Sequence, residues 1–392
     1  MAILNVSELT EGMITLAPIV TKRGQSIAKE GTVLTDQLIS KLTFYKIETV
    51  EVDIPEPEPD IFLESEPEPE PVPQKEVMSD SISYMQRLKT SPKFQMFQSD
   101  YALNIEYLKE NFEAIIAGAG DECADMLLEN VETLFRSKTS LELFDMLHLM
   151  RSVDDTVYAH SLNVALTSRA IGKWLKLPKE DLNVLTVAGV LHDIGKTQIP
   201  EEVLNKPGKY TDEEWEMVKS HPLQGKSILA DKGFDPRIIK AALQHHERFD
   251  GSGYPRGLFG DEIDDFAAII AIADVYDAMT AARSYREPLC SFQVIAEFEK
   301  EGIKKYNTSY ILTFLERIAN TYNNSRVILS NGKAGRVVYI NKNSLSKPVI
   351  EMDGGEILDL SNPKNSDISI KSMLYKKGCG PTGSQPFIFV II

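Results

Sequence analysis

Residues 245–263 read HHERFDGSGYPRGLFGDEI and are the most informative stretch of this chain. Two adjacent histidines open the stretch, at the end of an apolar helical pattern over residues 235–246. Gly251 and Gly253 follow in a flexible turn, because glycine adopts backbone conformations that other residues avoid. The turn leads into Tyr254 and Pro255. We therefore expect the two histidines to lie at a helix end, beside an irregular loop.

Other histidines and one aspartate are spaced at nearly regular intervals around this pair. Gaps of 32, 29 and 24 residues separate His160, His192, His221 and His245, and Asp274 follows His246 by 28. A helix of about 12–18 residues plus a connection uses roughly that much chain before the next helix reaches the same level. Side chains spaced in this way can converge from successive helices on one point inside a bundle.

The sequence around two of these positions supports convergence. His192 and Asp193 end an apolar helical pattern, VLTVAGVLHDIGK, in which Gly195 is suited to helix termination. Asp274 lies within FAAIIAIADVYDAM, a predicted helix that is apolar on nearly all faces and therefore buried. An unpaired carboxylate there would cost several kcal/mol through desolvation. A metal ion is the simplest partner for it.

A structural role is the alternative for each histidine. His148, in LFDMLHLMRS, suits that interpretation, because a lone helical histidine is more often structural than a ligand. For the other groups together, a structural role would require several independent coincidences. The sequence therefore predicts one metal site formed by His160, His192, Asp193, His221, His245, His246 and Asp274.

Seven such groups exceed the needs of one tetrahedral zinc ion. They suit two divalent ions about 3.5–4 Å apart, bridged by one carboxylate and leaving positions open for solvent. Nitrogen and oxygen ligands without thiolate favour iron or manganese. Two bridged ions would convert a shared water into hydroxide near neutral pH and stabilise charge on a phosphoryl group. The predicted reaction class is hydrolysis of a phosphoester.

Four segments resemble a known family. HDIGK at 192–196 resembles the core motif of the HD-domain phosphohydrolases, and residues 245–263 are similar to the extended motif of the HD-GYP subgroup, named after Gly253, Tyr254 and Pro255. ADVYDAMTAARSYREP at 273–288 and HSLNVA at 160–165 resemble flanking parts of that domain. The resemblance covers roughly residues 150–321.

The resemblance implies a role for each metal-binding position. One ion would be held by His160, His192, Asp193 and Asp274, and Asp193 would bridge to a second ion held by His221, His245 and His246. Some relatives carry a glutamate four residues before the first histidine and bind a third ion. Thr156 stands at that position here, so we expect two metals.

Other positions are implicated in substrate binding. Lys196 would stabilise the charge that develops on the phosphate. Arg283 and Arg286, at i, i+3 spacing, would face phosphate or guanine, with a solvated helix end as the alternative. Tyr254 and Pro255 would shape the pocket wall or a docking surface, unless the loop of Gly251 and Gly253 has a purely structural role. Asp277, three residues after Asp274, could support the metal ligands.

The activity implied is hydrolysis of cyclic di-GMP to pGpG through a metal-bridging hydroxide, with GMP as a further product in this family. The first alternative is an HD phosphohydrolase of another cyclic dinucleotide or nucleotide. The second is a catalytically silent cyclic di-GMP receptor or adaptor that uses the loop around Tyr254. Loss of a metal ligand or of Lys196 would favour a silent protein, and the sequence keeps all of them.

The chain of 392 residues is long enough for two or three domains. Residues 55–76 alternate proline with glutamate, a composition that forms neither helix nor sheet, and we interpret them as an extended acidic linker. The predicted fold is mainly α, an HD-type helical bundle with a small α+β N-terminal module and a short β-rich C-terminal tail. The domains predicted are the module 1–54, the linker 55–76, a helical connection 79–150, the catalytic domain 151–321 and the extension 322–392.

The charge and the termini limit the partners. A formal net charge of −16 argues against binding to a DNA or RNA polymer. No segment approaches the ~20 apolar residues that span a bilayer, no signal peptide is evident, and three scattered cysteines are typical of reduced thiols. We expect a cytoplasmic, bacterial-type protein. The N-terminal module or the loop around Tyr254 could mediate homodimerisation or bind a regulatory protein.

Overall fold

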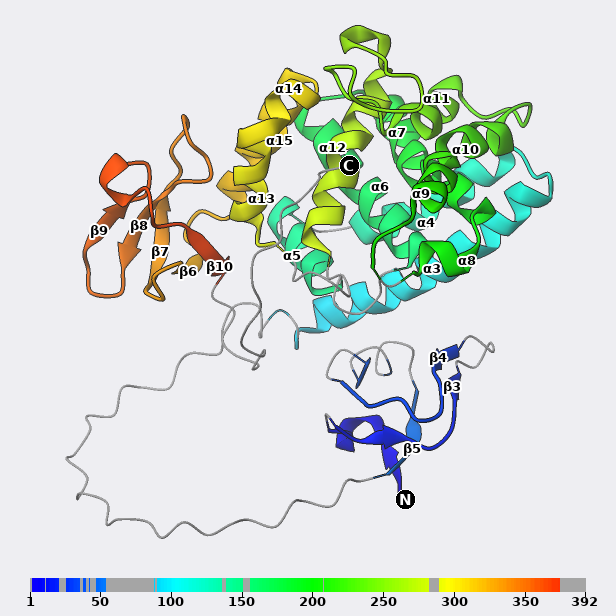
Figure 1. Ribbon diagram of the computed structural model, residues 1–392, viewed down its shortest axis with the longest axis horizontal. Helices are drawn as coiled ribbons and strands as arrows, with labels where there is room; N and C mark the ends of the chain where they lie inside the picture. The colour runs from blue at the N-terminus through cyan, green and yellow to red at the C-terminus, as the bar shows by residue number, and fades with distance from the viewer. Residues whose placement is uncertain are drawn as a thin grey trace.

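The computed structural model describes residues 2–10, 12–20, 26–35, 38, 39, 42, 47–53, 88, 90–135, 139–150, 156–206, 208–281 and 289–373. Most of them lie in helices, with small antiparallel sheets near both ends of the chain (Figure 1). The predicted mainly α fold is confirmed. The linker 55–76, Arg283, Arg286 and Cys379 lie outside the described residues. None of the described helices has the length and apolar character needed to cross a membrane.

The N-terminal module contains a three-stranded antiparallel sheet in the order β1-β5-β2. Its strands are β1 (Ala2–Asn5), β2 (Ile14–Thr15) and β5 (Thr49–Asp53), and β3 (Ile19–Val20) pairs separately with β4 (Ser26–Ala28). Residues in β5 alternate between buried and exposed, as expected for a strand with one face on a core. Val50 and Val52 face that core.

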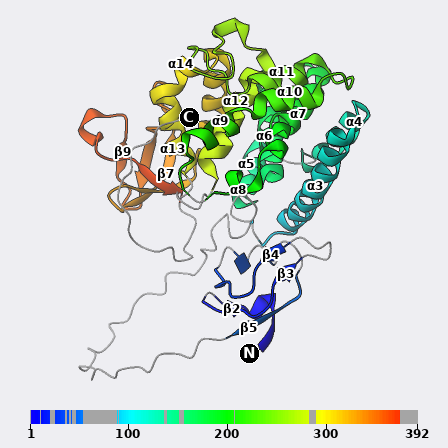
Figure 2. The same cartoon turned by 45° about the vertical axis from the view of Figure 1, so that its right-hand side comes forward.

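Among the described residues, the next four helices are α3 to α6, and α3 is the longest of them. Ser91 caps α3 by accepting a hydrogen bond from the Phe94 N–H, and Gly118, at φ 120°, ends it. Tyr101 on α3 donates a 2.7 Å hydrogen bond to Asn163 on α6, one turn beyond His160. α3 and α4 lie side by side (Figure 2). The bounds are α3 (Pro92–Ala117), α4 (Glu122–Phe135), α5 (Ser140–Met150) and α6 (Val157–Trp174).

The central bundle surrounds α12 (Asp265–Thr280), in which residues 266–274 are all buried. Apolar side chains cover all faces of this helix, as the sequence predicts. It packs against α6 and α11. The neighbouring elements are α7 (Lys179–Leu191), η2 (Ile194–Gln198), α8 (Glu201–Leu204), α9 (Asp212–Lys219), α10 (His221–Leu229) and α11 (Pro236–Gln244).

The apolar periodicity of the sequence predicts one helix over residues 211–231 and another over 291–321, and both are interrupted in the structure. The pattern over 211–231 forms α9 and α10, which meet at Ser220, because Pro222 lacks an N–H and clashes with the preceding turn. The pattern over 291–321 is interrupted before Asn307, whose side chain caps α15 by accepting from the N–H groups of Ser309 and Tyr310. It comprises α13 (Ser291–Glu297), a π-helical segment (Phe298–Gly302), α14 (Ile303–Lys305) and α15 (Thr308–Thr321).

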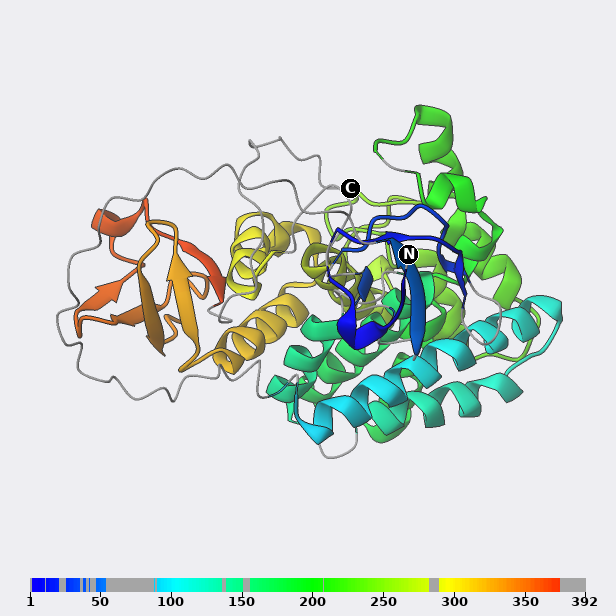
Figure 3. The same ribbon diagram turned by 90° about the horizontal axis from the view of Figure 1, so that it is seen from below.

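A five-stranded antiparallel sheet in the order β10-β6-β7-β8-β9 follows α15. It lies at one end of the helical part (Figure 3), and its inward residues join the same hydrophobic core. Glu299, in the π-helical segment, accepts hydrogen bonds from the Leu345 N–H at 2.6 Å and from Ser346. The strands are β6 (Arg326–Leu329), β7 (Ala334–Tyr339), β8 (Val349–Met352), β9 (Ile357–Asp359) and β10 (Ile370–Met373).

Gly195 differs from its predicted role as a helix terminator. α7 already ends at Leu191 with His192 as its cap, and Gly195 lies inside the 3-10 helix η2. A Cβ atom there would overlap the His221 carbonyl oxygen and lie 2.6 Å from the Gly225 nitrogen. Glycine is required because η2 and α10 approach backbone to backbone.

We predict that Gly195→Ala destabilises the helical bundle by about 1–3 kcal/mol or more, the cost of overpacking a site without room to relax. Gly225→Ala is the matched control, because a Cβ there would make ordinary contact, 3.5 Å from the Ala242 Cβ, and alanine favours a helix. Thermal unfolding should show a lower Tm for Gly195→Ala and an unchanged or higher Tm for Gly225→Ala. Equal Tm values in both variants would contradict the close approach.

Candidate metal centre

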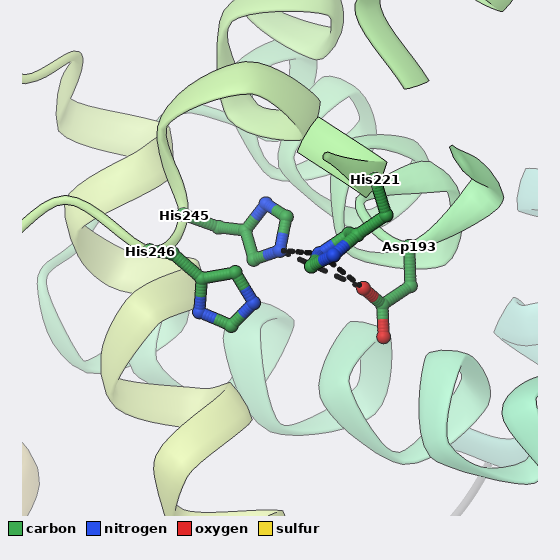
Figure 4. Close-up of side chains that lie close together, drawn as sticks. All are labelled: Asp193, His221, His245 and His246. Atoms are coloured by element: carbon green, nitrogen blue, oxygen red, sulfur yellow. Dashed lines mark hydrogen bonds and ion pairs between the residues drawn. The ribbon is translucent and has the colours of Figure 1, made fainter. Parts of the chain in front are cut away.

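The histidines and aspartates singled out by spacing lie together in two groups of potential metal ligands. The first contains His160, His192 and Asp274, and the second contains Asp193, His221, His245 and His246. Within each group, the potential ligand atoms all lie within 4.8 Å of one another. Helix ends supply most of them: His192 caps α7. His221 opens α10 and His245 caps α11 (Figure 4). His148 is in neither group.

Asp193 lies between the two groups. Its Oδ2 atom is 3.4 Å from the Nε2 atoms of both His160 and His192. Its Oδ1 atom is 3.2 Å from His221 Nε2 and 3.6 Å from His245 Nε2 (Figure 4). The side chain is 1% exposed. One carboxylate oxygen therefore faces each group, which is the arrangement expected of a bridging ligand.

In four of the histidine rings, Nδ1 lies within hydrogen-bond distance of a carbonyl or carboxylate oxygen. His192 Nδ1 lies 2.7 Å from the Gly189 carbonyl oxygen, and His221 Nδ1 lies 2.7 Å from that of Val218. His245 Nδ1 is near the Ala242 carbonyl oxygen, at 3.0 Å. His160 Nδ1 lies 2.8 Å from Asp277 Oδ2. These nitrogens must donate, so in each neutral ring Nε2 carries a lone pair directed into the site.

With this tautomer, the lone pairs of neighbouring imidazoles and of Asp193 face one another. His221 Nε2 is 3.2 Å from His245 Nε2, and both lone pairs point toward Asp193 Oδ1. Within the described chain, Asp193 Oδ1 and His192 Nε2 are buried without a hydrogen-bond partner. Buried acceptors this close repel one another unless a proton or cation lies between them. The donor set therefore fits metal ions, and it contains no thiolate.

The pKa shifts of three of the histidines agree with neutral imidazole ligands. Burial lowers the pKa of His192 to about 3, and burial also lowers the pKa of His221 and His246. At His160, burial opposes the charge, but the Asp274 and Asp277 carboxylates outweigh it and raise the pKa to about 9. A proton on His160 thus neutralises these carboxylates when no metal does.

Lys196 contacts the centre through Asp193. Its Nζ atom lies 2.6 Å from Asp193 Oδ2, and its side chain is 22% exposed. Burial opposes ionisation of Asp193, but the positive charge of Lys196 holds the pKa of this carboxyl well below its ordinary value. The lysine therefore places a positive charge between the buried carboxylate and solvent.

The loop after His246 packs against the centre. The Tyr254 ring stacks on the His246 ring with centroids 4.7 Å apart, and the Tyr254–Pro255 peptide bond is cis. Gly253 lies against the backbone of Glu247 and Arg248, where a Cβ would overlap it. Gly251, at φ 76°, has the Phe259 ring where its side chain would be. Both glycines are thus explained by close approach.

Sequence reasoning missed two residues of this region. Glu247 is 2% exposed, and its carboxylate accepts from the N–H groups of Arg256, at 2.8 Å, and Leu258, at 3.0 Å. Its position directly after His245 and His246 is the sequence signal that could have identified Glu247. Trp215, on α9, contacts Tyr254, and no spacing rule connects them. Thr156, the position discussed for a third metal, caps α6 by accepting from the Ala159 N–H.

Comparison with known proteins shows which families and structures this chain is similar to. A family model described as HD domain matches residues 124–309. A solved structure, the HDG"Y"P protein Bd1817 from Bdellovibrio bacteriovorus, has a TM-score of 0.52 at 17% identity and covers 81% of this chain and 99% of that one. At this identity the likeness shows the fold alone.

Curated relatives match parts of the chain. A cyclic di-GMP phosphodiesterase of Pseudomonas aeruginosa is 33% identical over 204 residues, 52% of this chain and 49% of that protein. The cyclic di-GMP phosphodiesterase response regulator RpfG of Xanthomonas campestris is 46% identical over 121 residues, 30% of this chain and 32% of that protein. A 3'3'-cGAMP-specific phosphodiesterase of Vibrio cholerae is 41% identical over 149 residues, 37% of this chain and 35% of that protein.

The chain thus spans half or less of the length of these relatives. The resemblance to the HD phosphohydrolases is confirmed by the family match, which includes both groups of histidines and aspartates. Residues 124–309 of this chain match the HD-domain family model, and this part of the chain is similar in sequence to cyclic di-GMP phosphodiesterases.

Proposed function

We propose that this chain is a metal-dependent phosphodiesterase that hydrolyses cyclic di-GMP to pGpG, with GMP as the product of a second cleavage. The position of Asp193 carries the proposal, because one buried carboxylate faces two ligand groups through different oxygens. The similarity to cyclic di-GMP phosphodiesterases supports the substrate.

Two divalent ions would occupy the centre. His160, His192 and Asp274 would hold one, His221, His245 and His246 the other, and Asp193 would bridge them. Iron or manganese suits this mixed imidazole and carboxylate set. When bound, two such ions activate water for attack and stabilise charge on a phosphoryl group.

The remaining side chains would act on the substrate. Lys196, beside Asp193 and partly exposed, can donate a hydrogen bond to a phosphate oxygen as negative charge grows there. Asp277 would orient the His160 ring through its 2.8 Å contact with Nδ1. Arg283 and Arg286 remain proposed phosphate or guanine contacts. Tyr254 and Pro255 remain proposed parts of the pocket wall.

A second candidate is hydrolysis of another cyclic dinucleotide. The similarity to 3'3'-cGAMP-specific phosphodiesterases of Vibrio cholerae favours this alternative. A silent cyclic di-GMP receptor is disfavoured, because each of the predicted metal-binding residues and Lys196 lies at the centre.

The rest of the chain would regulate this reaction. We propose the division into the module 1–54, the linker 55–76, the helical connection 79–150, the catalytic domain 151–321 and the extension 322–392, in a cytoplasmic protein. A homodimer contact or a regulatory protein would use the N-terminal module or the loop around Tyr254. Removing residues 1–76 and measuring turnover and oligomeric state tests this assignment.

Asp193→Ala should abolish both metal binding and turnover, because it removes the ligand shared by the two groups. The protein would be loaded anaerobically with iron or manganese, its metal content measured, and pGpG and GMP separated by chromatography. Asp125→Ala, which removes an exposed carboxylate on α4, is the matched control and should keep both. Turnover that persists in Asp193→Ala would refute the metal mechanism. Protein that binds two metals yet hydrolyses only 3'3'-cGAMP would establish the second candidate.

Lys196→Met should lower kcat by about 100-fold while two metals remain bound, because it removes a charge that acts on the phosphate and leaves the ligands in place. Lys226→Met, an exposed lysine on α10, is the control and should leave kcat unchanged. Metal analysis of the same samples separates the possible roles. Loss of a metal from Lys196→Met would show that the lysine assembles the site instead of acting on substrate.

A further inference from the structure

His246 differs from the other four histidines of the centre in how its ring is held. Each of the others has Nδ1 within hydrogen-bond distance of a carbonyl or carboxylate oxygen. Among the described residues, the His246 ring makes no hydrogen bond, and Asp274 Oδ2 is 3.8 Å from Nδ1. An imidazole that must present a lone pair to a metal needs a fixed orientation. Something other than a hydrogen bond must supply it.

Stacking on Tyr254 supplies that constraint. The two ring centroids are 4.7 Å apart and the planes are inclined by 24°, a near-parallel stack. The backbone strengthens the pairing, because the Tyr254 N–H donates to the His246 carbonyl oxygen at 3.2 Å. Gly253 allows this approach by lacking a side chain. Glu247 anchors the far side of the loop through the Arg256 and Leu258 N–H groups.

Trp215 holds the Tyr254 ring in turn. The indole meets the phenol at a centroid distance of 6.2 Å and an interplanar angle of 78°, an edge-to-face contact. Tyr210 stacks on the indole at 6.3 Å and 16°. Rings thus lie in series, from Tyr210 and Trp215 at and just before the start of α9, through Tyr254 in the loop, to His246 at the centre.

Interactions at the start of α9 fix the position of Trp215. Thr211 and Glu214 form a capping box, in which the Glu214 N–H donates to Thr211 Oγ1 and the Thr211 N–H to Glu214 Oε2. Lys206 forms an ion pair with Glu214 at 2.6 Å. His221 opens the next helix two residues after α9 ends. The segment that holds the indole therefore also carries a predicted ligand of the same metal.

We propose that Trp215, acting through Tyr254, is a positioning residue for His246 and so tunes the affinity of the second metal. This inference rests on the proposed metal centre and assigns Tyr254 a role through its ring, not its hydroxyl. A substrate contact by the hydroxyl is the competing role. It would affect KM and leave metal affinity unchanged.

The test measures Mn²⁺ binding by calorimetry and electron paramagnetic resonance, without substrate. Tyr254→Leu and Trp215→Leu should weaken one of the two Mn²⁺ sites by about tenfold or more, the usual effect of removing a group that orients a ligand. Tyr254→Phe and Trp215→Phe keep an aromatic ring and should stay within about twofold of the parent. Circular dichroism spectra and Tm values identify any variant that does not fold. Unchanged Mn²⁺ affinity in the folded leucine variants would overturn the proposal.

A double variant tests whether Trp215 acts through Tyr254. If it does, Tyr254→Leu combined with Trp215→Leu should bind Mn²⁺ no more weakly than Tyr254→Leu alone. If the two losses of Mn²⁺ affinity multiply in the double variant, Trp215 does not act through Tyr254 and the proposal is overturned. Because binding is measured without substrate, failure of cyclic di-GMP turnover with this pattern intact would refute the proposed substrate alone. Loss of Mn²⁺ binding by the parent protein would refute the metal centre itself.

Discussion

The buried carboxylate of Asp193 is the constraint on which the centre depends. With 1% of its side chain exposed, it loses hydration and needs compensating positive charge. Lys196 provides one contact, and the neutral imidazoles of His192, His221 and His245 turn lone pairs toward it instead of protons. Such a site is stable only with added cations or protons, which links metal binding to the integrity of the bundle.

The helical bundle places most of the potential metal ligands around Asp193 at helix ends. A side chain at a helix terminus has its backbone set by the helix and can still project beyond the packed surface. Gly195 lets η2 lie against α10 closely enough for Asp193 and His221 to meet, and their atoms are 3.2 Å apart. Carbonyl groups one turn back, at Gly189 and Val218, then set the imidazole tautomers. The same helices therefore provide both ligands and the groups that orient them.

The mainly α fold and the gathering of the histidines were predictable, because the repeat of 24–32 residues matches a helix plus its connection. The place of Asp274 in a metal site was predictable, because a carboxylate in a buried apolar helix needs a cation or a hydrogen-bond network. The single helix predicted over 211–231 was wrong, since apolar periodicity continues across Pro222 although the hydrogen-bond ladder does not. Gly195 was misread as a terminator because sequence shows a glycine but not the backbone that approaches it. Arg283 and Arg286 stay predictions.

By itself the sequence determined which residue types are available for chemistry and along which helices they recur, since periodicity and composition are local properties. The family resemblance already implied a division of these side chains into two groups, but only the tertiary structure decided which Asp193 oxygen faces each group and which nitrogen of each ring points inward. It also decided that Trp215, Tyr254 and His246 stack in series. Ring orientation and close packing depend on contacts between residues distant in the chain, and no spacing along one segment encodes those contacts.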